Sequence, residues 1–573
     1  MARSNDEVAR AFEEFADLLA IVSGDPYKPR AYEKAARSIG GYAHELRGLD
    51  ETGILAIPNV GKSIAEKVHA VLETGSFPEL DDLRAQVPPG VREMTAIPGF
   101  GPKKAVVVYR ELGIKDLDAL VAAATEGRLR GLKGFSAKTE ENVLQAVERA
   151  SRDTGRVHID VALDVAETFL GRLREVRGVR RAEYAGSLRR MAETIGDVDL
   201  LVASADPTPV MDVFVGADDV ARVLAHGDAK SSVVTRSGMQ VDLRVVPIEA
   251  WGAAMIYFTG SKPHNVRIRE MAVRKGMKLN EYGLFRVEDD ELIAAETEEV
   301  VYERLGLPYI EPTLREDRGE VEAALAGDLP SVVTLRQIRG DLHTHTDLTD
   351  GVATLEQMLE AASAKGYAYY AVTDHAPNLF MQRMTDEKML AQRARIAALR
   401  PRFPKMTLLH GTELNIDPSG EVDWPSEFLE GFDVTVASIH SAFHQSRDEM
   451  TRRMIRAMEH PNVHVIGHPT TRKIGRRDPV DLDLEAVFEA AARTGTALEI
   501  DAYPDRLDLR DEHVRWAHRH GVRFAIDTDS HAVGHLDAMR YGVGVAQRGW
   551  LTKDDVINAW PLSKLRRFLS KRG

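Results

Sequence analysis

Residues 186–201 read GSLRRMAETIGDVDLL, and the interpretation of the whole chain starts from this segment. Its second half is an apolar run in which Asp197 and Asp199 are two positions apart. Side chains at i and i+2 of a strand point to the same face, so the two carboxylates are expected to project together. Adjacent carboxylates repel unless a divalent cation lies between them, and hard oxygen ligands suit Mg²⁺ or Mn²⁺. An isolated Asp-x-Asp pair, however, is more often a turn or a helix cap.

A second candidate strand lies further along the chain. Residues 241–246 read VDLRVV, in which apolar and polar residues alternate as they do in a half-buried strand. Asp242 in this segment could complete the site with Asp197 and Asp199. Three carboxylates on two strands predict a two-metal centre for phosphoryl transfer, with Mg²⁺ or Mn²⁺ as the cofactor.

The residues that precede the paired acids strengthen this interpretation. Gly186 and Ser187 are expected to form a flexible turn whose N–H groups and hydroxyl hold phosphate oxygens, and Arg190 can pair with a triphosphate. Together, the GSLRR, GDVD and VDLR motifs resemble the nucleotidyltransferase palm of family X DNA polymerases, the group that includes polymerase beta. The resemblance implies DNA-directed transfer of nucleotides from deoxynucleoside triphosphates, with the three carboxylates as catalytic metal ligands.

The composition of the chain limits the remaining possibilities. A length of 573 residues implies several domains. No run of eighteen apolar residues and no apolar N-terminal signal region is present, so we expect a soluble, cytoplasmic protein without a membrane partner. The absence of cysteine excludes disulfides, thiolate zinc sites and a cysteine nucleophile. A net charge of −14 argues against broad attraction to nucleic acid, so any DNA contact must be local.

Residues 1–88 are expected to form a helical domain. Within it, residues 55–68 read LAIPNVGKSIAEKV, which predicts a helix, a tight turn and a second helix, the helix-hairpin-helix unit. Such a turn directs backbone N–H groups at a phosphate, which binds DNA without sequence preference or much positive charge. Gly61 would make this contact. Asn59 stands where a glycine is usual, and Asn tolerates the left-handed conformation.

Residues 89–150 are expected to be a second DNA-binding subdomain of the same kind. The pattern recurs as AIPGFGPKKA at 96–105 and as LKGFSAKT at 132–139. Ser136 replaces the second glycine of the third copy, which weakens a DNA-binding role for that copy. A single copy is equally consistent with an ordinary helical hairpin and with a DNA-binding site, but three copies favour DNA binding. The candidate contacts in these two regions are Gly61, Gly99, Gly101, Lys103 and Lys104.

Lys67 in the first unit aligns with the lysine that forms a Schiff base with deoxyribose phosphate in the lyase domain of polymerase beta. An amine does this chemistry only when its pKa is lowered, which a sequence does not reveal. The alternative is that Glu66 and Lys67 lie on a solvated helix face.

The palm is expected at residues 151–250, followed by a nucleotide-selecting subdomain at 251–315 and a polar, weakly helical linker at 316–336. The segments YFTGS at 257–261 and LNEYG at 279–283 resemble the nucleotide-selecting subdomain of the same polymerase family.

This second resemblance assigns roles to individual residues. It implies that Tyr257, Phe258 and Gly260 lie against the incoming nucleotide, that Asn265 reaches the base edge and that Arg269 touches the template strand. Aromatic side chains can stack or restrict a sugar, and Asn can hydrogen-bond a minor-groove acceptor. Core packing is an equally good interpretation of Phe258.

Residues 337–573 show a different pattern, in which short apolar runs end in polar clusters and are followed by helical segments. The clusters are residues 341–345, 372–375, 411–413, 438–440, 466–468, 498–501 and 527–531. Seven strand-and-helix repeats predict a parallel barrel with its catalytic residues at the C-terminal ends of the strands. The predicted fold is therefore a multidomain α/β chain, with helix-hairpin-helix units, an α+β palm and a distorted (β/α)₇ barrel.

Five of the seven strand ends carry histidine, and His343 and His345 share one strand face at metal-ligand spacing. The pattern resembles the PHP domain, named for polymerase and histidinol phosphatase, whose relatives hold two or three Mn²⁺ or Zn²⁺ ions. The ligand positions that this resemblance implies are His343, His345, Asp350, His375, Glu413, His440, His468, Asp529 and His531. Three other histidines, His410, His444 and His464, fall outside the pattern.

A metal cluster of this kind forms hydroxide from bound water near neutral pH, so the barrel is expected to hydrolyse phosphoesters. The resemblance covers nearly the whole chain. It implies a monomeric bacterial-type family X polymerase that fills gapped or nicked DNA during repair and carries a 3′-5′ exonuclease, sometimes with cleavage at abasic sites. Lys473, Arg476 and Arg477 could steer a DNA end to the rim, although a solvated loop is as good an interpretation.

Three alternatives stay open on sequence grounds. The palm could belong to an untemplated nucleotidyltransferase, the barrel could be a small-molecule phosphatase, or the chain could be a DNA-binding scaffold with inactive sites. The complete sets of three palm carboxylates and nine barrel ligands argue against the scaffold.

Overall fold

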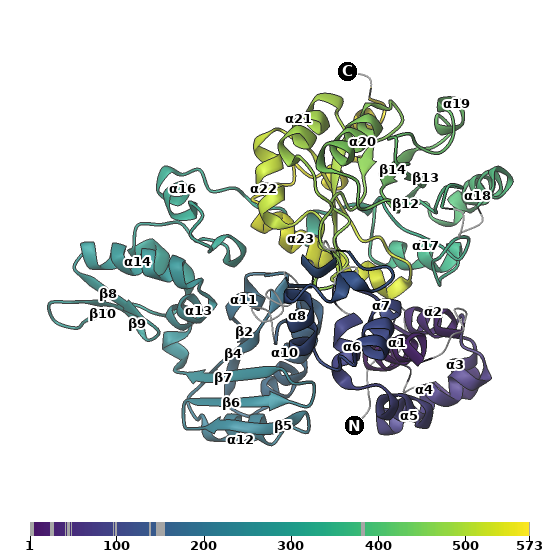
Figure 1. The fold of residues 1–573 in the computed structure, drawn as a ribbon. Coiled ribbons are helices and arrows are strands. Elements are labelled where there is room, and N and C mark those ends of the chain that lie inside the picture. The colour runs from purple at the N-terminus through teal and green to yellow at the C-terminus, as the bar shows by residue number, and fades with distance from the viewer. Residues whose placement is uncertain are drawn as a thin grey trace.

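The computed structural model describes residues 5–22, 28–40, 42, 46, 49–95, 97, 100–136, 139–141, 143–144, 155–379 and 384–571. The chain is arranged as helical N-terminal units, a palm, a selecting subdomain (residues 251–315) and a C-terminal barrel (Figure 1). In this view the barrel lies above the palm and the N-terminal helices, and the selecting subdomain extends to the left. The predicted multidomain α/β class is confirmed.

The N-terminal region is a set of short helices around one hydrophobic core. Phe12 and Phe15 on the first helix both pack against Phe77, and the core continues through both predicted DNA-binding units. The helices are α1 (Asn5–Val22), α2 (Lys28–Gly40), α3 (Glu51–Leu55), α4 (Lys62–Thr74), α5 (Pro78–Gln86), α6 (Pro89–Thr95), α7 (Pro102–Leu112) and α8 (Leu117–Thr125), followed by a 3₁₀ turn at Leu129–Gly131.

The predicted hairpin turns lie between α3 and α4 and between α6 and α7. Asn59 adopts the left-handed conformation with φ of 62°, as expected from the sequence. Gly61 and Gly101 are the N-caps of α4 and α7, so each turn leads directly into a helix N-terminus. Gly99 and the side chain of Lys103 lie outside the described residues.

The palm contains a five-stranded sheet in the order β2-β4-β7-β6-β5. Apolar residues of α10 and α12 pack on this sheet in one core. Its elements are β1 (Val157–His158), α10 (Ile159–Arg174), β2 (Val179–Tyr184), α11 (Gly186–Arg189), β3 (Thr194–Ile195), β4 (Asp197–Ser204), α12 (Thr208–Val215), β5 (Val220–His226), β6 (Lys230–Thr235) and β7 (Gln240–Val246).

The selecting subdomain combines helices with a small antiparallel sheet of order β10-β9-β8. The elements are η3 (Ile248–Ala250), α13 (Trp251–Thr259), α14 (Lys262–Arg274), β8 (Met277–Asn280), β9 (Gly283–Arg286), β10 (Leu292–Ala294), α15 (Glu298–Arg304) and η4 (Pro312–Leu314).

The segment after η4 was expected to be a polar linker, but part of it is buried. It contains α16 (Glu320–Ala326), and the carboxylate of Glu320 accepts a hydrogen bond of 2.7 Å from His264 with both side chains fully enclosed. Burial of a charged group requires a partner, and α14 supplies one. The segment is therefore packed onto the selecting subdomain.

The barrel has seven parallel strands that follow one another in sequence order, from β11 to β17. A further parallel bridge joins Thr344, after β11, to Ser530, after β17, which nearly closes the barrel. The strands are β11 (Gly340–Asp341), β12 (Tyr369–Val372), β13 (Thr407–Asn415), β14 (Val434–Ser438), β15 (Val465–Ile466), β16 (Ala497–Asp501) and β17 (Phe524–Asp527).

Each barrel strand is followed by a helix, as predicted. The helices are α17 (Leu355–Ala364), α18 (Asp386–Leu399), α19 (Ser426–Leu429), α20 (Arg447–Glu459), α21 (Leu484–Thr494), α22 (Asp511–Arg519) and α23 (Met539–Arg548), with α24 (Leu562–Leu569) at the end. The shorter 3₁₀ segments are η5 (Leu335–Gln337), η7 (Arg400–Arg402), η8 (Val533–Ala538) and η9 (Ile557–Ala559).

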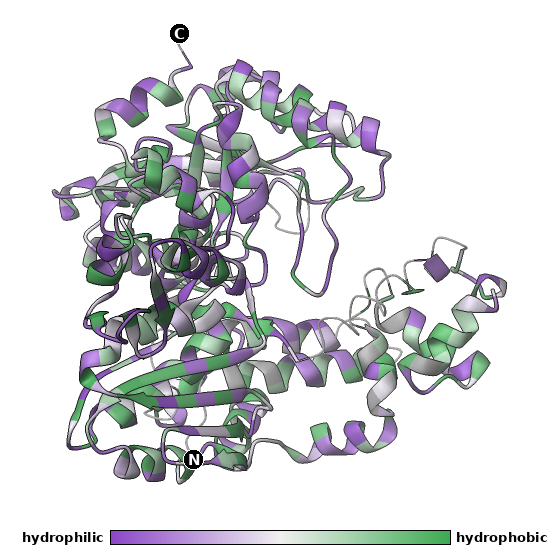
Figure 2. Cartoon of the chain, turned by 90° about the vertical axis from the view of Figure 1, so that its left-hand side faces the viewer, coloured by the Kyte–Doolittle hydropathy of each residue, from purple (hydrophilic) through white to green (hydrophobic). Residues whose placement is uncertain are grey.

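The sheet strands are largely hydrophobic, whereas the covering helices carry hydrophilic residues along much of their length (Figure 2). This distribution is typical of strands enclosed by helices in an α/β fold. Of the helices in the described ranges, none combines the length and apolar character required to cross a bilayer.

Candidate active sites

The palm acids lie on two adjacent parallel strands. The register of β4 and β7 places Asp199 directly opposite Asp242, and Asp197 opposite Gln240. Asp197 is exposed, and the other two acids are half-buried. The structure therefore brings the three predicted carboxylates to one edge of the sheet, where their oxygens suit a divalent cation.

The electrostatics of these acids show strong mutual repulsion. Burial, together with the neighbouring carboxylates of Asp197 and Asp242, raises the pKa of Asp199 to about 7. The ammonium group of Lys230 lies 3.2 Å from Asp242, and Gln240 donates a hydrogen bond of 3.0 Å to the same carboxylate. Despite burial, these partners lower the pKa of Asp242. A cation that binds beside the three acids would stabilise the ionised form of the carboxylate whose pKa is raised.

Gly186 lies directly against Asp199 of β4. Its backbone has φ of 59°, and a Cβ atom at this position would come within 2.3 Å of an Asp199 carboxylate oxygen. Residues from Gly186 onward form the short helix α11 rather than the flexible turn that was predicted. Ser187 is half-buried on this helix. A side chain at residue 186 would displace the Asp199 carboxylate, which explains why glycine is required there.

The predicted triphosphate residue Arg190 already has protein partners. Its Nε donates a hydrogen bond of 3.0 Å to Glu316, and its Nη1 donates one of 2.6 Å to the carbonyl oxygen of Thr259. The adjacent Arg189 instead pairs with Glu298, with Nη2 and Oε2 2.6 Å apart. Arg189 thus connects the palm to the selecting subdomain, and Arg190 connects it to both the selecting subdomain and the segment that follows.

The predicted nucleotide-contacting side chains gather around α13 and α14. Tyr257 is 38% exposed, and its ring packs edge-on against Phe258. Phe258 also packs against a small core and lies under the guanidinium of Arg244, so a packing role is supported. Asn265 donates a hydrogen bond of 2.7 Å to the carbonyl oxygen of Tyr257, and Arg269 donates one of 3.2 Å to the Asn265 carbonyl oxygen.

The barrel ligands converge on the carboxylate of Glu413. Ring nitrogens of five histidines lie between 2.8 and 3.5 Å from its two oxygens. These histidines are His343, His345, His375, His440 and His468. The barrel explains this convergence, because parallel strands deliver their C-terminal ends to one rim.

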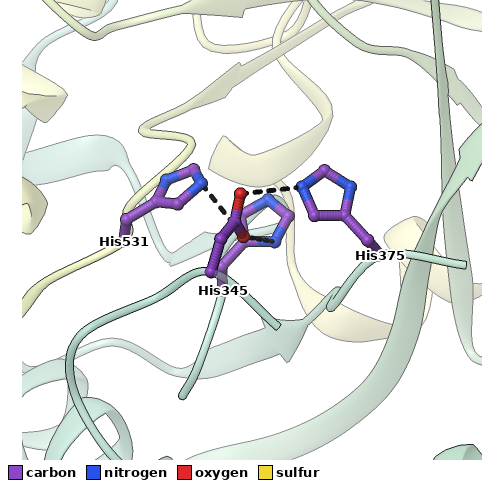
Figure 3. Close-up of side chains that lie close together, drawn as sticks. His345, His375 and His531 are labelled. Carbon is purple, nitrogen blue, oxygen red and sulfur yellow. Dashed lines mark ion pairs between the residues drawn. The ribbon is translucent and has the colours of Figure 1, made fainter. Parts of the chain in front are cut away.

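Asp350 and Asp529 complete the cluster. Figure 3 shows the rings of His345, His375 and His531 around one carboxylate, which belongs to Asp350 and lies 3.3 to 3.8 Å from them. Asp529 lies 3.1 Å from His345. All nine residues predicted by the resemblance are therefore brought together.

The donor set fits divalent cations. Three groups of ligand atoms, each with all members within 4.8 Å of one another, lie in the cluster: His345, Asp350, His375 and His531; His343, His345 and Asp529; and His375, Glu413 and His440. Two ligands of one cation, each about 2.1 Å from it, are separated by roughly 3 Å, which matches the contacts around Glu413. Neutral imidazole with carboxylate suits Zn²⁺ and Mn²⁺.

The charge state of Glu413 also fits a metal ligand. Burial alone would raise the pKa of its carboxyl, but the surrounding histidines outweigh this effect and hold the pKa well below its usual range. The carboxylate is therefore ionised. Despite burial, the same pairing raises the pKa of His343 and His375, so a cation that binds here displaces protons from these rings.

Residues around the cluster that the sequence did not identify orient the ligands. The fully buried Glu499 lies 2.7 Å from Nδ1 of His343, and Asn415 Oδ1 lies 3.3 Å from Nδ1 of His440. Such partners fix which ring nitrogen faces a metal. Glu499 stands in a predicted strand end, but only the closed packing of the barrel, in which β16 lies between β15 and β17, shows which histidine it contacts.

The remaining predicted residues are placed as follows. Lys67 is buried and forms an ion pair with Glu79 at 2.6 Å. Lys104 lies over the ring of Phe135, whereas Gly61 is exposed. His410 and His464 are buried core residues, and His444 is exposed.

The basic loop after His468 is occupied by contacts within the protein. Lys473 pairs with Asp505 at 2.9 Å, Arg477 donates to the Thr471 carbonyl oxygen at 2.7 Å, and Arg476 lies 3.7 Å from Glu13 on α1. The loop therefore joins the barrel to the N-terminal helices, and a free DNA-steering role for all three side chains is not supported.

Comparison with known domain families matches four stretches of the chain. A DNA polymerase beta thumb matches residues 254–316, a helix-hairpin-helix domain matches 3–77, a SAM-like helix-hairpin-helix tandem matches 91–149 and a PHP domain matches 341–502. Together with the two sites, these matches define a family X DNA polymerase with a PHP domain.

The chain belongs to the PolX family of these polymerases. It is 35% identical over 568 residues to the DNA polymerase/3′-5′ exonuclease PolX of Bacillus subtilis (strain 168), covering 99% of both chains. It is also 28% identical to DNA polymerase lambda of Rattus norvegicus, over 52% of this chain and 53% of the relative. A probable phosphatase of Thermoanaerobacter sp. (strain X514) is 26% identical over 40% of this chain and 94% of its own length.

Proposed function

We propose that this polymerase fills short gaps in DNA during repair and removes 3′ nucleotides with its barrel. The single observation that supports nucleotide addition best is the parallel pairing that sets Asp199 opposite Asp242 beside Gly186. The full-length similarity to a relative named as polymerase and exonuclease supports the combination of activities.

In the palm, Asp197, Asp199 and Asp242 would hold Mg²⁺ or Mn²⁺, which supplies charge neutralisation and activation of the primer hydroxyl. Ser187 and Arg190 would bind the triphosphate and stabilise charge on the departing pyrophosphate. Tyr257 and Asn265 line a small pocket in the selecting subdomain with Arg269, which supports their role beside the incoming nucleotide. The exposed turn at Gly61 and the turn at Gly101 would grip the DNA backbone at helix N-termini.

In the barrel, the nine clustered side chains would hold two or three Mn²⁺ or Zn²⁺ ions, which supply a hydroxide nucleophile and neutralise the phosphate. Glu499 would keep Nε2 of His343 directed into the cluster. A 3′-5′ exonuclease is the economical activity, because the other domains hold DNA with a 3′ end.

The similarity to a probable phosphatase across the barrel favours a second candidate, hydrolysis of a small phosphomonoester. A direct test presents the protein with histidinol phosphate and with a 3′-labelled DNA duplex under the same metal conditions. Release of labelled nucleotide without phosphate from histidinol phosphate supports the exonuclease, and the reverse result contradicts it.

Gap filling is tested separately from untemplated addition. Incorporation is measured on one-nucleotide gaps, longer gaps and single strands, with Mg²⁺ and with Mn²⁺. We expect addition that stops when the gap is filled and little extension of single strands. Extension of single strands at the same rate would contradict templated gap filling.

Lyase activity at Lys67 stays a prediction. Borohydride trapping of the protein on an incised abasic site measures it, and we expect Lys67→Ala to lose the cross-link. A variant that cross-links fully would exclude Lys67, and its pairing with Glu79 makes this test necessary. Cleavage of an intact abasic site in the same substrate would report endonuclease activity of the barrel.

We also expect a monomer that acts in the cytoplasm, because the DNA-gripping turns and both candidate sites belong to one chain. Sedimentation of the free protein and of its complex with gapped DNA measures the stoichiometry, and a stable dimer would contradict this expectation.

A further inference from the structure

The barrel reaches the polymerase part of the chain through the last residue of α23. The guanidinium of Arg548 lies 2.7 Å from Glu316 and 3.0 Å from Asp511, and its Nη1 donates a hydrogen bond of 2.8 Å to the carbonyl oxygen of Arg190. Arg548 therefore touches the last residue of the GSLRR motif in the palm and the segment that follows the selecting subdomain.

Glu316 joins this barrel arginine to the nucleotide site. One oxygen, Oε1, accepts from both Arg548 and Arg190, at 2.7 and 3.0 Å. The side chains of all three residues are at most 18% exposed. Burial alone would raise the pKa of Glu316, but the two guanidinium groups outweigh it and hold the pKa below its usual range. A carboxylate shared by two buried arginines forms short, directional, charge-assisted hydrogen bonds.

Close packing holds the same two surfaces together. A Cβ atom on Gly544, in the middle of α23, would come within 2.7 Å of the Met191 side chain. A second ion pair joins Glu193 of the palm to Arg472 of the barrel at 2.7 Å, but it contacts neither Arg190 nor Glu316. The palm loop is thus fixed against the barrel at two separate points.

The hydrogen bonds of Arg190 leave part of its guanidinium available. Nε is bound to Glu316 and Nη1 to Thr259, while Nη2 makes no hydrogen bond within the described part of the chain. A planar guanidinium held at two nitrogens presents the third in a fixed direction. Fixing a binding group in advance reduces the entropy lost when a ligand binds.

We propose that Arg548 is a positioning residue for nucleotide addition, which acts through Glu316 to orient Arg190 toward the triphosphate. The barrel would then be a structural part of the polymerase site as well as a separate phosphoesterase. This inference rests on the proposed triphosphate contact of Arg190.

The test measures the Kd of a deoxynucleoside triphosphate with Mg²⁺, and kcat and KM on a one-nucleotide gap, using the full chain. We expect Arg548→Gln to raise the Kd and KM for the triphosphate by about tenfold with a smaller change in kcat. Gapped-DNA affinity and 3′-end hydrolysis should be unchanged. Arg548→Lys, which keeps the charge, should recover part of the loss.

The matched control is Glu193→Gln, which removes the ion pair between Glu193 of the palm and Arg472 of the barrel. A general loosening of the interface would affect both variants alike, whereas the proposal predicts a change in triphosphate affinity only for Arg548→Gln. Glu316→Gln provides a second route if Arg548→Gln does not fold, and it should give the same change in Kd.

A double-mutant cycle completes the test. If Arg548 acts through Arg190, the double variant Arg190→Gln, Arg548→Gln should bind triphosphate no more weakly than Arg190→Gln alone. Two outcomes would overturn the positioning role while leaving the proposed function intact. One is that the losses of triphosphate affinity in the two single variants add up in the double variant. The other is that Arg190→Gln weakens triphosphate binding whereas Arg548→Gln and Glu316→Gln leave the Kd unchanged. An unchanged Kd for Arg190→Gln would contradict the triphosphate role of Arg190 and the positioning role together.

Discussion

The palm and the barrel present two very different candidate metal sites in one chain. In the palm, three carboxylates line one sheet edge, one of them exposed and one held by Lys230. In the barrel, nine side chains from several strand ends, among them the buried carboxylate of Glu413, form one cluster. Within the described residues, every group of three or more ligand atoms closer than 4.8 Å lies in the barrel.

This difference indicates how each site is completed. A triphosphate and a primer bring their own oxygen ligands, so the palm needs to supply only part of a coordination sphere. A barrel that activates water must hold its metals between reactions, which requires a full set of protein ligands. The partly exposed palm acids therefore suit metals that arrive with substrate, and the buried cluster suits resident metals.

The largest expected effect comes from removing one ligand of each site. Asp242→Asn should lower nucleotide addition by roughly a thousandfold or more and leave 3′-end hydrolysis intact, because the palm would lose one of three carboxylates. His343→Ala should do the reverse. Primer extension and release of a labelled 3′ nucleotide measure the two activities on one substrate.

Two substitutions outside the sites serve as controls. Asp212 and His444 are exposed, and neither Asp212→Asn nor His444→Gln should alter either activity. Loss of both activities in Asp242→Asn or in His343→Ala, with folding preserved, would show that the two centres are not independent.

A smaller effect is expected at the glycine beside the palm acids. Gly186→Ala should lower kcat for addition by about a hundredfold, because the new Cβ would strain a left-handed backbone and displace the Asp199 carboxylate. Primer extension measures the loss, and hydrolysis by the barrel should not change.

Gly178→Ala separates the two causes of that loss. Gly178 also has a positive φ, of 97°, but the nearest atom to an added Cβ is 3.8 Å away. We expect this variant to lose some stability and to keep its activity. Equal losses of activity in both variants would mean that backbone strain, rather than contact with Asp199, limits addition.

Orientation of the barrel histidines should have a more modest effect. Glu499→Gln keeps a hydrogen-bonding group beside His343 but removes the charge, so hydrolysis should fall by about tenfold. Glu499→Ala should lower the rate of hydrolysis further, because it removes the hydrogen-bonding group as well. The orienting role is tested by measuring the metal content and the hydrolysis rate of each variant. A Glu499→Ala protein with normal metal content and a normal hydrolysis rate would contradict it.

The smallest expected effect concerns stability. Resident metals that bind only the folded barrel should stabilise it by about 3 kcal/mol at a hundredfold excess over Kd, so removal by a chelator should lower the Tm of the barrel. Calorimetry with and without chelator measures the shift. Glu413→Gln should abolish this chelator-induced change in Tm, and Asp197→Asn should leave it unchanged. If Asp197→Asn abolished the change and Glu413→Gln did not, the resident metal would be assigned to the palm.

Much of this arrangement follows from local sequence patterns. The spacing of Asp197 and Asp199 predicted that they share one strand face, and alternation at 241–246 predicted a second strand with Asp242. Histidines at successive apolar runs predicted a cluster on one barrel rim. The segment after residue 315 was less predictable. Its polar composition indicated a linker, yet Glu316 and Glu320 are held by Arg548 and His264, because distant residues supply their partners.

The sequence by itself determined which groups can do chemistry here: the paired acids, the glycine beside them, the hairpin turns and the histidines at the strand ends. These features depend on short-range spacing, which secondary structure converts directly into shared faces and edges. Only the tertiary structure decided that Glu499 faces His343 and that Glu316 joins Arg190 to Arg548. Such contacts connect residues remote in sequence, and their geometry is set by how whole domains pack.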